Sequence, residues 1–221
     1  MKKGMTIFSL FVLGIFLLAG CNSAGDTKPQ EKALATYADG STEAYALYQL
    51  TDHNIGTAKG GVVAKEQNLV NVYVKNYAEP GAPTSWSPVP QVMSSQRLTI
   101  LGGTWPGETA PDPERYTEFA VSPIEGKTFT ADSISVYGGG GGGNNMKFSI
   151  SIGTKDDFSD AVEILKVTSN PKNTMKLYEA PVSATVKSGE TLYIRFYPWY
   201  TDNASGKYLC ISELKIHGKI K

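Results

Sequence analysis

Cysteine and histidine are scarce in this sequence, and their scarcity excludes several kinds of catalytic site. Among 221 residues there are two cysteines and two histidines, His53 and His217. No His-Glu-x-x-His motif and no paired-cysteine spacing is present, so the usual zinc-binding patterns are absent. A Ser-His-Asp triad would need one of the two histidines, yet no Gly-x-Ser-x-Gly motif occurs. We therefore expect neither a zinc enzyme nor a serine hydrolase.

An excess of charge of one sign is also missing. The 21 basic residues balance the 21 acidic residues, which gives a formal net charge of zero. Proteins that bind nucleic acids neutralise phosphates with a basic surface. The sequence therefore predicts no nucleic-acid partner.

Helical periodicity is nearly absent as well, and short alternating runs of apolar and polar residues take its place. Typical runs are Phe129–Tyr137, Met146–Ile152 and Leu192–Tyr197, with glycine, proline and Asn-Asp clusters between them. This pattern predicts an all-β protein, an antiparallel β-sandwich or jelly roll. Only Thr42–Leu50 and Asp157–Ile164 are expected to contain helical turns.

The N-terminus has the features of a bacterial lipoprotein signal. A positive start, Met1–Lys3, precedes an apolar run that ends in Leu-Ala-Gly-Cys, which resembles a lipobox. We expect residues 1–20 to be a signal peptide, Cys21 to be acylated, and residues 21–32 to be a lipidated tether. Two or three acyl chains give stable membrane anchoring. The predicted location is the bacterial cell envelope, at the outer membrane or the cell surface.

The rest of the sequence divides into two parts. Residues 115–221 are expected to form the core of the sandwich. Residues 33–114 supply N-terminal strands and loops, either as part of the sandwich or as a small extension. Two loops rich in proline and glycine carry Trp86 and Trp105, each of which is interpreted as a lid on the core or as an exposed stacking platform. Cys210 lies in an apolar run and is predicted to be a buried thiol.

Six consecutive glycines, Gly138–Gly143, interrupt the strand pattern. Such a run is costly to order, and three explanations stay open. The backbone approaches a neighbouring strand or ligand, the loop is flexible and has no role, or backbone carbonyls and Asn side chains bind Ca²⁺, with Asp156, Asp157 and Asp202 as candidate extra ligands. A phosphate site is excluded because no Lys-Ser/Thr pair and no helix follow the glycines.

The strand near the C-terminus carries the strongest functional indication. With a period of two, Tyr193, Arg195 and Tyr197 share one face, opposite the apolar side chains. Aromatic rings stack on the C–H faces of sugars, and arginine forms bidentate bonds with vicinal hydroxyls or a uronate carboxylate. A simpler interpretation is that the two tyrosines pack under a loop. The predicted ligand-binding residues are Tyr193, Arg195, Tyr197 and Trp199, with Tyr200 and Asn203 at the rim.

Three functional hypotheses follow from this face. The first is a lipid-anchored protein that binds a polysaccharide or oligosaccharide without cleaving it. The second is a structural or adhesion lipoprotein whose aromatic face binds a protein partner, since aromatic residues and arginine also dominate protein interfaces. The third and weakest is a polysaccharide lyase that uses Arg195 with Tyr193 or Tyr197. We expect no catalytic activity.

The C-terminal half resembles a known family. The segments that carry the resemblance are Phe119–Thr130, Gly138–Met146, Gly189–Tyr200 and Gly206–Ile211. They are similar to motifs of the β-sandwich accessory domains in Bacteroidetes pectate lyases and related polysaccharide-degrading enzymes. The resemblance implies a jelly roll of the galactose-binding kind that binds glycans without cleaving them, either plant cell-wall polysaccharides or polysaccharides that contain uronate. Those domains precede a β-helix catalytic domain that this sequence does not contain, so we expect a free-standing lipoprotein.

Overall fold

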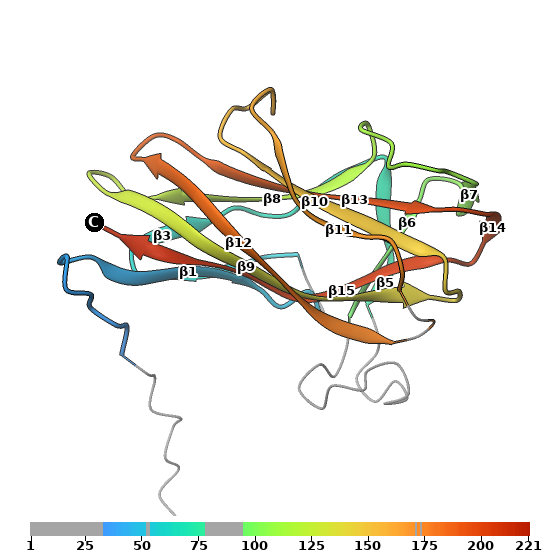
Figure 1. The fold of residues 1–221 in the computed structure, drawn as a ribbon, viewed down its shortest axis with the longest axis horizontal. Coiled ribbons are helices and arrows are strands. Elements are labelled where there is room, and N and C mark those ends of the chain that lie inside the picture. The colour runs from blue at the N-terminus through green and yellow to red at the C-terminus, as the bar shows by residue number, and fades with distance from the viewer. Residues whose placement is uncertain (1–32, 52–53, 78–94, 171, 173) are drawn as a thin grey trace, which may run out of the picture. The chain divides into compact units, whose positions relative to one another are not determined.

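The protein is an antiparallel β-sandwich. The computed structural model describes residues 33–51, 54–77, 95–170, 172 and 174–221. Within them, all strand pairs run antiparallel and form two large sheets that pack face to face (Figure 1). The predicted fold class is therefore confirmed. None of the described residues belongs to a helix that could cross a membrane.

The first layer is a seven-stranded sheet. Its strands follow the order β12-β9-β15-β1-β2, and β6 pairs with both β15 and β5. The strands are β1 (Thr42–Tyr48), β2 (Thr57–Lys59), β5 (Val72–Tyr77), β6 (Gln96–Ile100), β9 (Thr128–Gly141), β12 (Met175–Lys187) and β15 (Tyr208–Ile220).

The second layer is a six-stranded sheet with the order β11-β10-β13-β8-β3, in which β4 also pairs with β8. A separate two-stranded sheet joins β7 to β14. The strands of these two sheets are β3 (Val62–Ala64), β4 (Asn68–Val70), β7 (Thr104–Pro106), β8 (Tyr116–Pro123), β10 (Met146–Gly153), β11 (Val162–Val167), β13 (Leu192–Tyr200) and β14 (Asn203–Ser205). Strands that precede residue 107 thus contribute to all three sheets.

The segment Thr42–Leu50 was expected to hold a helical turn, and this prediction is wrong. Residues Thr42–Tyr48 form β1, which pairs along its whole length with β15. Ala44, Ala46 and Tyr48 are fully buried at alternate positions. Alanine and leucine favour helices, but the preference of each residue is small, and the burial of one strand face overrides it. In the second segment, Asp157–Ile164, turns at residues 157 and 159–160 precede β11, which begins at Val162.

Aromatic side chains fill the space between the sheets. Phe119 packs edge-on against Phe196 with ring centroids 5.6 Å apart, and Phe148 stacks on Phe196 at 6.1 Å. Tyr48 lies beside Phe119 at 4.8 Å, and its hydroxyl donates to the carbonyls of Lys65 and Ala120. Burial raises the pKa of this tyrosine. The tyrosine thus contributes to the core and satisfies two carbonyls at its margin.

A buried polar network also lies in the core. The amides of Gln67 and Gln96 bond to each other in both directions, and Gln67 also donates to Thr117. All three residues are at most 5% exposed. Because Gln96 belongs to the seven-stranded sheet and Thr117 to the six-stranded sheet, the network links the two layers.

The structure explains the glycine run by close backbone approach. Gly138–Gly141 continue β9 and pair with β15, and Gly138 and Gly139 also pair with β12. A Cβ atom on Gly139 would lie 2.2 Å from the carbonyl oxygen of Thr174, and one on Gly142 would lie 2.2 Å from that of Gly206. These contacts leave no room for a side chain.

Trp105 and Cys210 are both buried. The indole of Trp105 is fully covered and donates to the carbonyl of Lys207, so this tryptophan acts as a lid. Trp86 lies outside the described residues. Cys210 is 3% exposed, and burial raises the pKa of its thiol to about 11. It packs with Met175 in a small cluster apart from the main core.

Candidate functional site on the six-stranded sheet

β13 presents its polar side chains on the outer face of the six-stranded sheet. Ile194 and Phe196 are fully buried, whereas Tyr193, Arg195 and Tyr197 are partly exposed. The strand pairs with β8 on one side and β10 on the other. The predicted division of this strand into an inner and an outer face is therefore confirmed.

Arg195 is held by neighbours on all sides. Its Nε donates to the carboxylate of Glu118 at 2.6 Å, and both side chains are 14% exposed. The guanidinium lies 4.1 Å from the ring centroid of Tyr116 and 4.0 Å from that of Phe158. Two aromatic rings therefore contact it and Glu118 balances its charge. The Nε atom is thus engaged within the protein, and the bidentate contact of Arg195 with a ligand stays a prediction.

The loop between β10 and β11 lies over part of this face. Phe158 from this loop is 7% exposed and contacts Arg195, while Asp156 accepts a hydrogen bond from the Tyr193 hydroxyl. Asp160 accepts bonds from the backbone and side chain of Thr154, which lowers its pKa to about 2. The carboxylate therefore fixes the turn that holds Phe158. The simpler expectation, tyrosines packed under a loop, is met in part by Tyr193.

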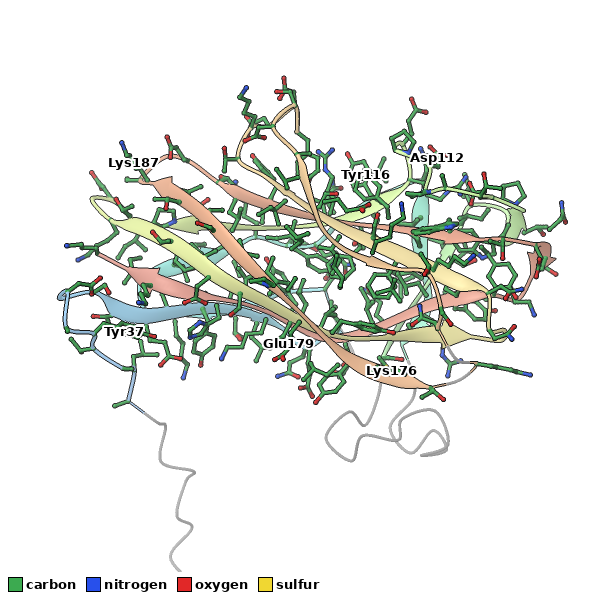
Figure 2. The ribbon with its side chains drawn as sticks, in the orientation of Figure 1. Tyr37, Asp112, Tyr116, Lys176, Glu179 and Lys187 are labelled. Carbon is green, nitrogen blue, oxygen red and sulfur yellow. The ribbon has the colours of Figure 1, made fainter. Side chains whose placement is uncertain are left out.

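Three tyrosines remain partly exposed on this face, and we name them the tyrosine patch: Tyr116, Tyr193 and Tyr197. Tyr116 and Tyr197 lie on neighbouring strands with ring centroids 5.6 Å apart. Figure 2 shows Tyr116 on the side of the sandwich opposite Glu179. The ammonium group of Lys65 lies 5.8 Å from the ring centroid of Tyr193. Lys166 of β11 and Tyr197 of β13 both pair with Ser149 of β10, so the three residues lie in one row across the sheet.

Trp199 and Tyr200 are placed differently from their predicted roles. Trp199 is 2% exposed and Tyr200 is 4% exposed, so neither ring is available to stack on a ligand. Tyr200 packs in the main core, and Lys166 lies 5.9 Å from the ring of Trp199. The expected contact of these two rings with a sugar is corrected accordingly. Asn203 is exposed in β14, beyond the end of β13.

The lyase hypothesis finds little support in the chemistry of the tyrosines. A tyrosine that acts as a base must lose its proton, which requires a lowered pKa. The hydrogen bond to Asp156 raises the pKa of Tyr193. Burial raises the pKa of Tyr197, although the neighbouring Arg195 opposes this effect. Neither hydroxyl is prepared for proton abstraction.

The aspartates considered for Ca²⁺ lie at opposite ends of β13. Asp156 bonds to Tyr193, whereas Asp202 follows Tyr200 and accepts from Asn145. Seven residues of extended strand separate these two ends by about 23 Å, too far for one ion. Among the described residues, no group of three acidic, histidine or cysteine side chains could hold a metal.

Three residues of this face were missed by the sequence analysis. Tyr116 and Glu118 alternate along β8, and their pattern resembles any half-exposed strand. Phe158 has a positive φ of 58° in a polar turn, and nothing in its sequence neighbourhood shows that it folds back on β13. The register of β8 against β13, which pairs Glu118 with Arg195, would have revealed two of the three.

Comparisons with known proteins give remote structural likenesses. No protein-family model and no curated protein sequence matches this chain. The xylan-binding CBM22-1 domain from Paenibacillus barcinonensis is 13% identical, with a TM-score of 0.36, over 77% of this chain and 92% of that domain. A family 11 carbohydrate-binding module from Clostridium thermocellum is 13% identical, with a TM-score of 0.34, over 78% of this chain and 95% of the module.

Enzymes are found at the same level of similarity. A Stig cyclase from Fischerella sp. TAU is 9% identical, with a TM-score of 0.35, over 89% of this chain and 92% of that protein. Because binding modules and an enzyme score alike, and all TM-scores are low, these likenesses support no conclusion about function.

Proposed function

We propose that this protein binds carbohydrate at the tyrosine patch and does not cleave it. The observation that carries the proposal is the rigid mounting of partly exposed tyrosines around an engaged arginine. Arg195 contacts Tyr116, and Asp156 fixes the hydroxyl of Tyr193. Rings that are already ordered lose little conformational entropy when a ligand binds.

The spacing of the patch favours an oligosaccharide over a single sugar. Tyr193 and Tyr197 are four residues apart on one strand, which corresponds to about 13 Å. A ligand that contacts both rings must therefore extend along β13. The C–H faces of successive sugar residues would lie on the tyrosine rings.

The charges beside the patch favour an acidic polysaccharide. The carboxylates of Glu118 and Asp156 are engaged by Arg195 and Tyr193. Lys65 lies close to the ring of Tyr193, and Lys166 lies near the other end of the strand. Two ammonium groups at the ends of the patch would attract the carboxylates of a uronate-containing chain, such as a pectin of plant cell walls.

Affinity electrophoresis through gels that contain pectin, xylan or β-glucan tests this function. We expect pectin to retard the purified protein and Tyr116→Ala or Tyr197→Ala to weaken the retardation about tenfold. Such a loss corresponds to about 1.4 kcal/mol, within the range for one aromatic contact. Added salt should also weaken binding, because the lysines contribute.

Tyr73→Ala provides the matched control, since Tyr73 is a partly exposed tyrosine on β5 of the other sheet. Pectin should retard the Tyr73→Ala variant as much as the wild type. Unchanged mobility of the wild type in every gel would refute carbohydrate binding. Release of unsaturated sugars from pectin during the assay would refute the absence of catalysis.

We also propose that the protein is anchored to the bacterial envelope by acyl chains on Cys21. The lipobox-like sequence before this residue supports the proposal. In a bacterial host fed a clickable fatty acid, the wild type and Cys210→Ser should both be labelled, and Cys21→Ser should not. Persistent labelling of Cys21→Ser, or an unlabelled wild type, would contradict the anchor.

A further inference from the structure

A groove of about 410 Å³ with both polar and apolar lining residues lies on the outer face of the seven-stranded sheet. Three adjacent strands form it, and Figure 2 places Glu179 on the side of the sandwich away from Tyr116. None of the residues predicted as ligand contacts lines this groove. The side chains that face it are Glu179 and Pro181 of β12, Asp132, Ser133 and Ser135 of β9, and Lys215 and His217 of β15.

Irregular strand pairing surrounds the groove. The register of β12 on β9 shifts after Pro181, and that of β15 on β9 shifts on both sides of the segment Lys215–His217. Such β-bulges redirect side chains and are common beside binding sites. Glu179, Ser135 and Lys215 form one row across the three strands. The two outer strands of this row lie about 10 Å apart, which accommodates one sugar ring.

One wall of the groove is fixed by His217. Its Nδ1 lies 2.8 Å from Asp132 and its Nε2 lies 3.2 Å from Glu43. Each carboxyl has a lowered pKa: a bond from the Ala35 backbone dominates for Glu43, and for Asp132 the bonds from His217 and Ser133 outweigh the opposing effect of burial. Both groups are therefore ionised at neutral pH. The wall is an ordered set of charges that strands β1, β9 and β15 hold in place.

The other polar groups of the groove are open to a ligand. Glu179 is exposed, and no hydrogen bond or ion pair of the described residues involves its carboxylate. Lys215 lies over the ring of Tyr45 at 4.5 Å, which orients its ammonium group. Glu179 of β12, Ser135 of β9 and Lys215 of β15 thus offer a carboxylate, a hydroxyl and an ammonium group in one row across the groove.

We propose that this groove is a second carbohydrate site and that it takes a neutral sugar residue. The inference rests on the proposed carbohydrate-binding function. A polyhydroxylated ring can donate to Glu179 and accept from Lys215 and Ser135, while the exposed ring of Pro181 offers an apolar surface to its C–H face. A uronate would meet the exposed carboxylate of Glu179, and the carboxylate of Asp132 also lines the groove, so the groove selects against acidic sugars.

Two sites on opposite faces would give the protein a bridging activity. The tyrosine patch would hold an acidic chain and the groove would hold a neutral one. A protein with both sites can connect two polysaccharide chains, and binding at the second site gains from high local concentration.

NMR titration of the purified protein with a neutral xylo-oligosaccharide and with an oligogalacturonide tests the inference. The neutral ligand should shift resonances of the groove, and the acidic ligand should shift those of the tyrosine patch. Glu179→Gln should lower the affinity for the neutral ligand about tenfold, as expected when a hydrogen bond to a charged group is lost. The matched control is Glu125→Gln, an exposed glutamate in the turn between β8 and β9, which should change neither affinity.

The outcomes separate the two proposals. If Glu179→Gln leaves the neutral ligand unaffected, or that ligand shifts only the tyrosine patch, the groove is not a site and the proposed function stands. If the neutral ligand binds the groove but neither ligand shifts the tyrosine patch, the location of the proposed function is wrong and the groove inference holds. If neither ligand shifts any resonance, both proposals fail.

Discussion

Gly139→Ala is expected to destabilise the protein by about 3 kcal/mol or more, the range of severe overpacking. The new Cβ would lie 2.2 Å from the carbonyl oxygen of Thr174 and 3.2 Å from the Cα of Met175. Both are backbone atoms at the start of β12, so the clash cannot be relieved by the movement of a flexible side chain. Urea denaturation should show a lower midpoint with an unchanged slope.

Gly102→Ala is the control that separates steric clash from backbone strain. Gly102 has a φ of +82°, and no atom lies within 4 Å of its Cβ position. Alanine there should cost only the strain of the left-handed conformation, about 1 to 2 kcal/mol. If Gly139→Ala costs no more than Gly102→Ala, close approach does not explain the glycine run.

The fold was predictable because the sequence signals of a β-sandwich, alternating apolar residues and turn residues, are local and recur in most strands. Alternation of buried and exposed residues along β10, β13 and β15 survives in the sequence, and turn residues mark the strand ends. β1 was misread because its buried positions hold two alanines, which leave little apolar contrast. The pairing of Gln67 with Gln96 could not be predicted, because nothing in the sequence distinguishes a buried glutamine from an exposed one.

The candidate site was predictable only in part, for a related reason. Period two assigns Tyr193, Arg195 and Tyr197 to one face of a strand, but it does not show what lies above that face. The loop that carries Asp156 and Phe158 covers part of it. Trp199 continues the outward alternation and is nevertheless 2% exposed, so exposure cannot be inferred from direction alone.

Glu118→Gln is expected to destabilise the protein by about 2 kcal/mol and to weaken ligand binding at the tyrosine patch. The substitution removes the charge that balances Arg195, and a mostly buried charge without its partner is costly. The expected cost is below that of a fully buried pair, because both side chains are 14% exposed. Urea denaturation measures the stability, and affinity electrophoresis measures the binding.

A double-mutant cycle with Arg195→Met identifies the role of the arginine. Each single variant leaves one charge without its partner, so the double variant should be more stable than the sum of the two losses predicts. Arg195 contacts Tyr116 and Phe158, and we therefore expect every variant that frees or removes it to disorder the patch and lower affinity.

The opposite assignment makes a different prediction. If Arg195 contacted the ligand directly, Glu118→Gln would free its guanidinium and raise the affinity for an acidic chain. A gain of affinity in Glu118→Gln would therefore show that Arg195 is a ligand contact, as the sequence alone predicts. A loss of both affinity and stability would show that Arg195 positions the tyrosines, so that binding depends on an ion pair that no ligand touches.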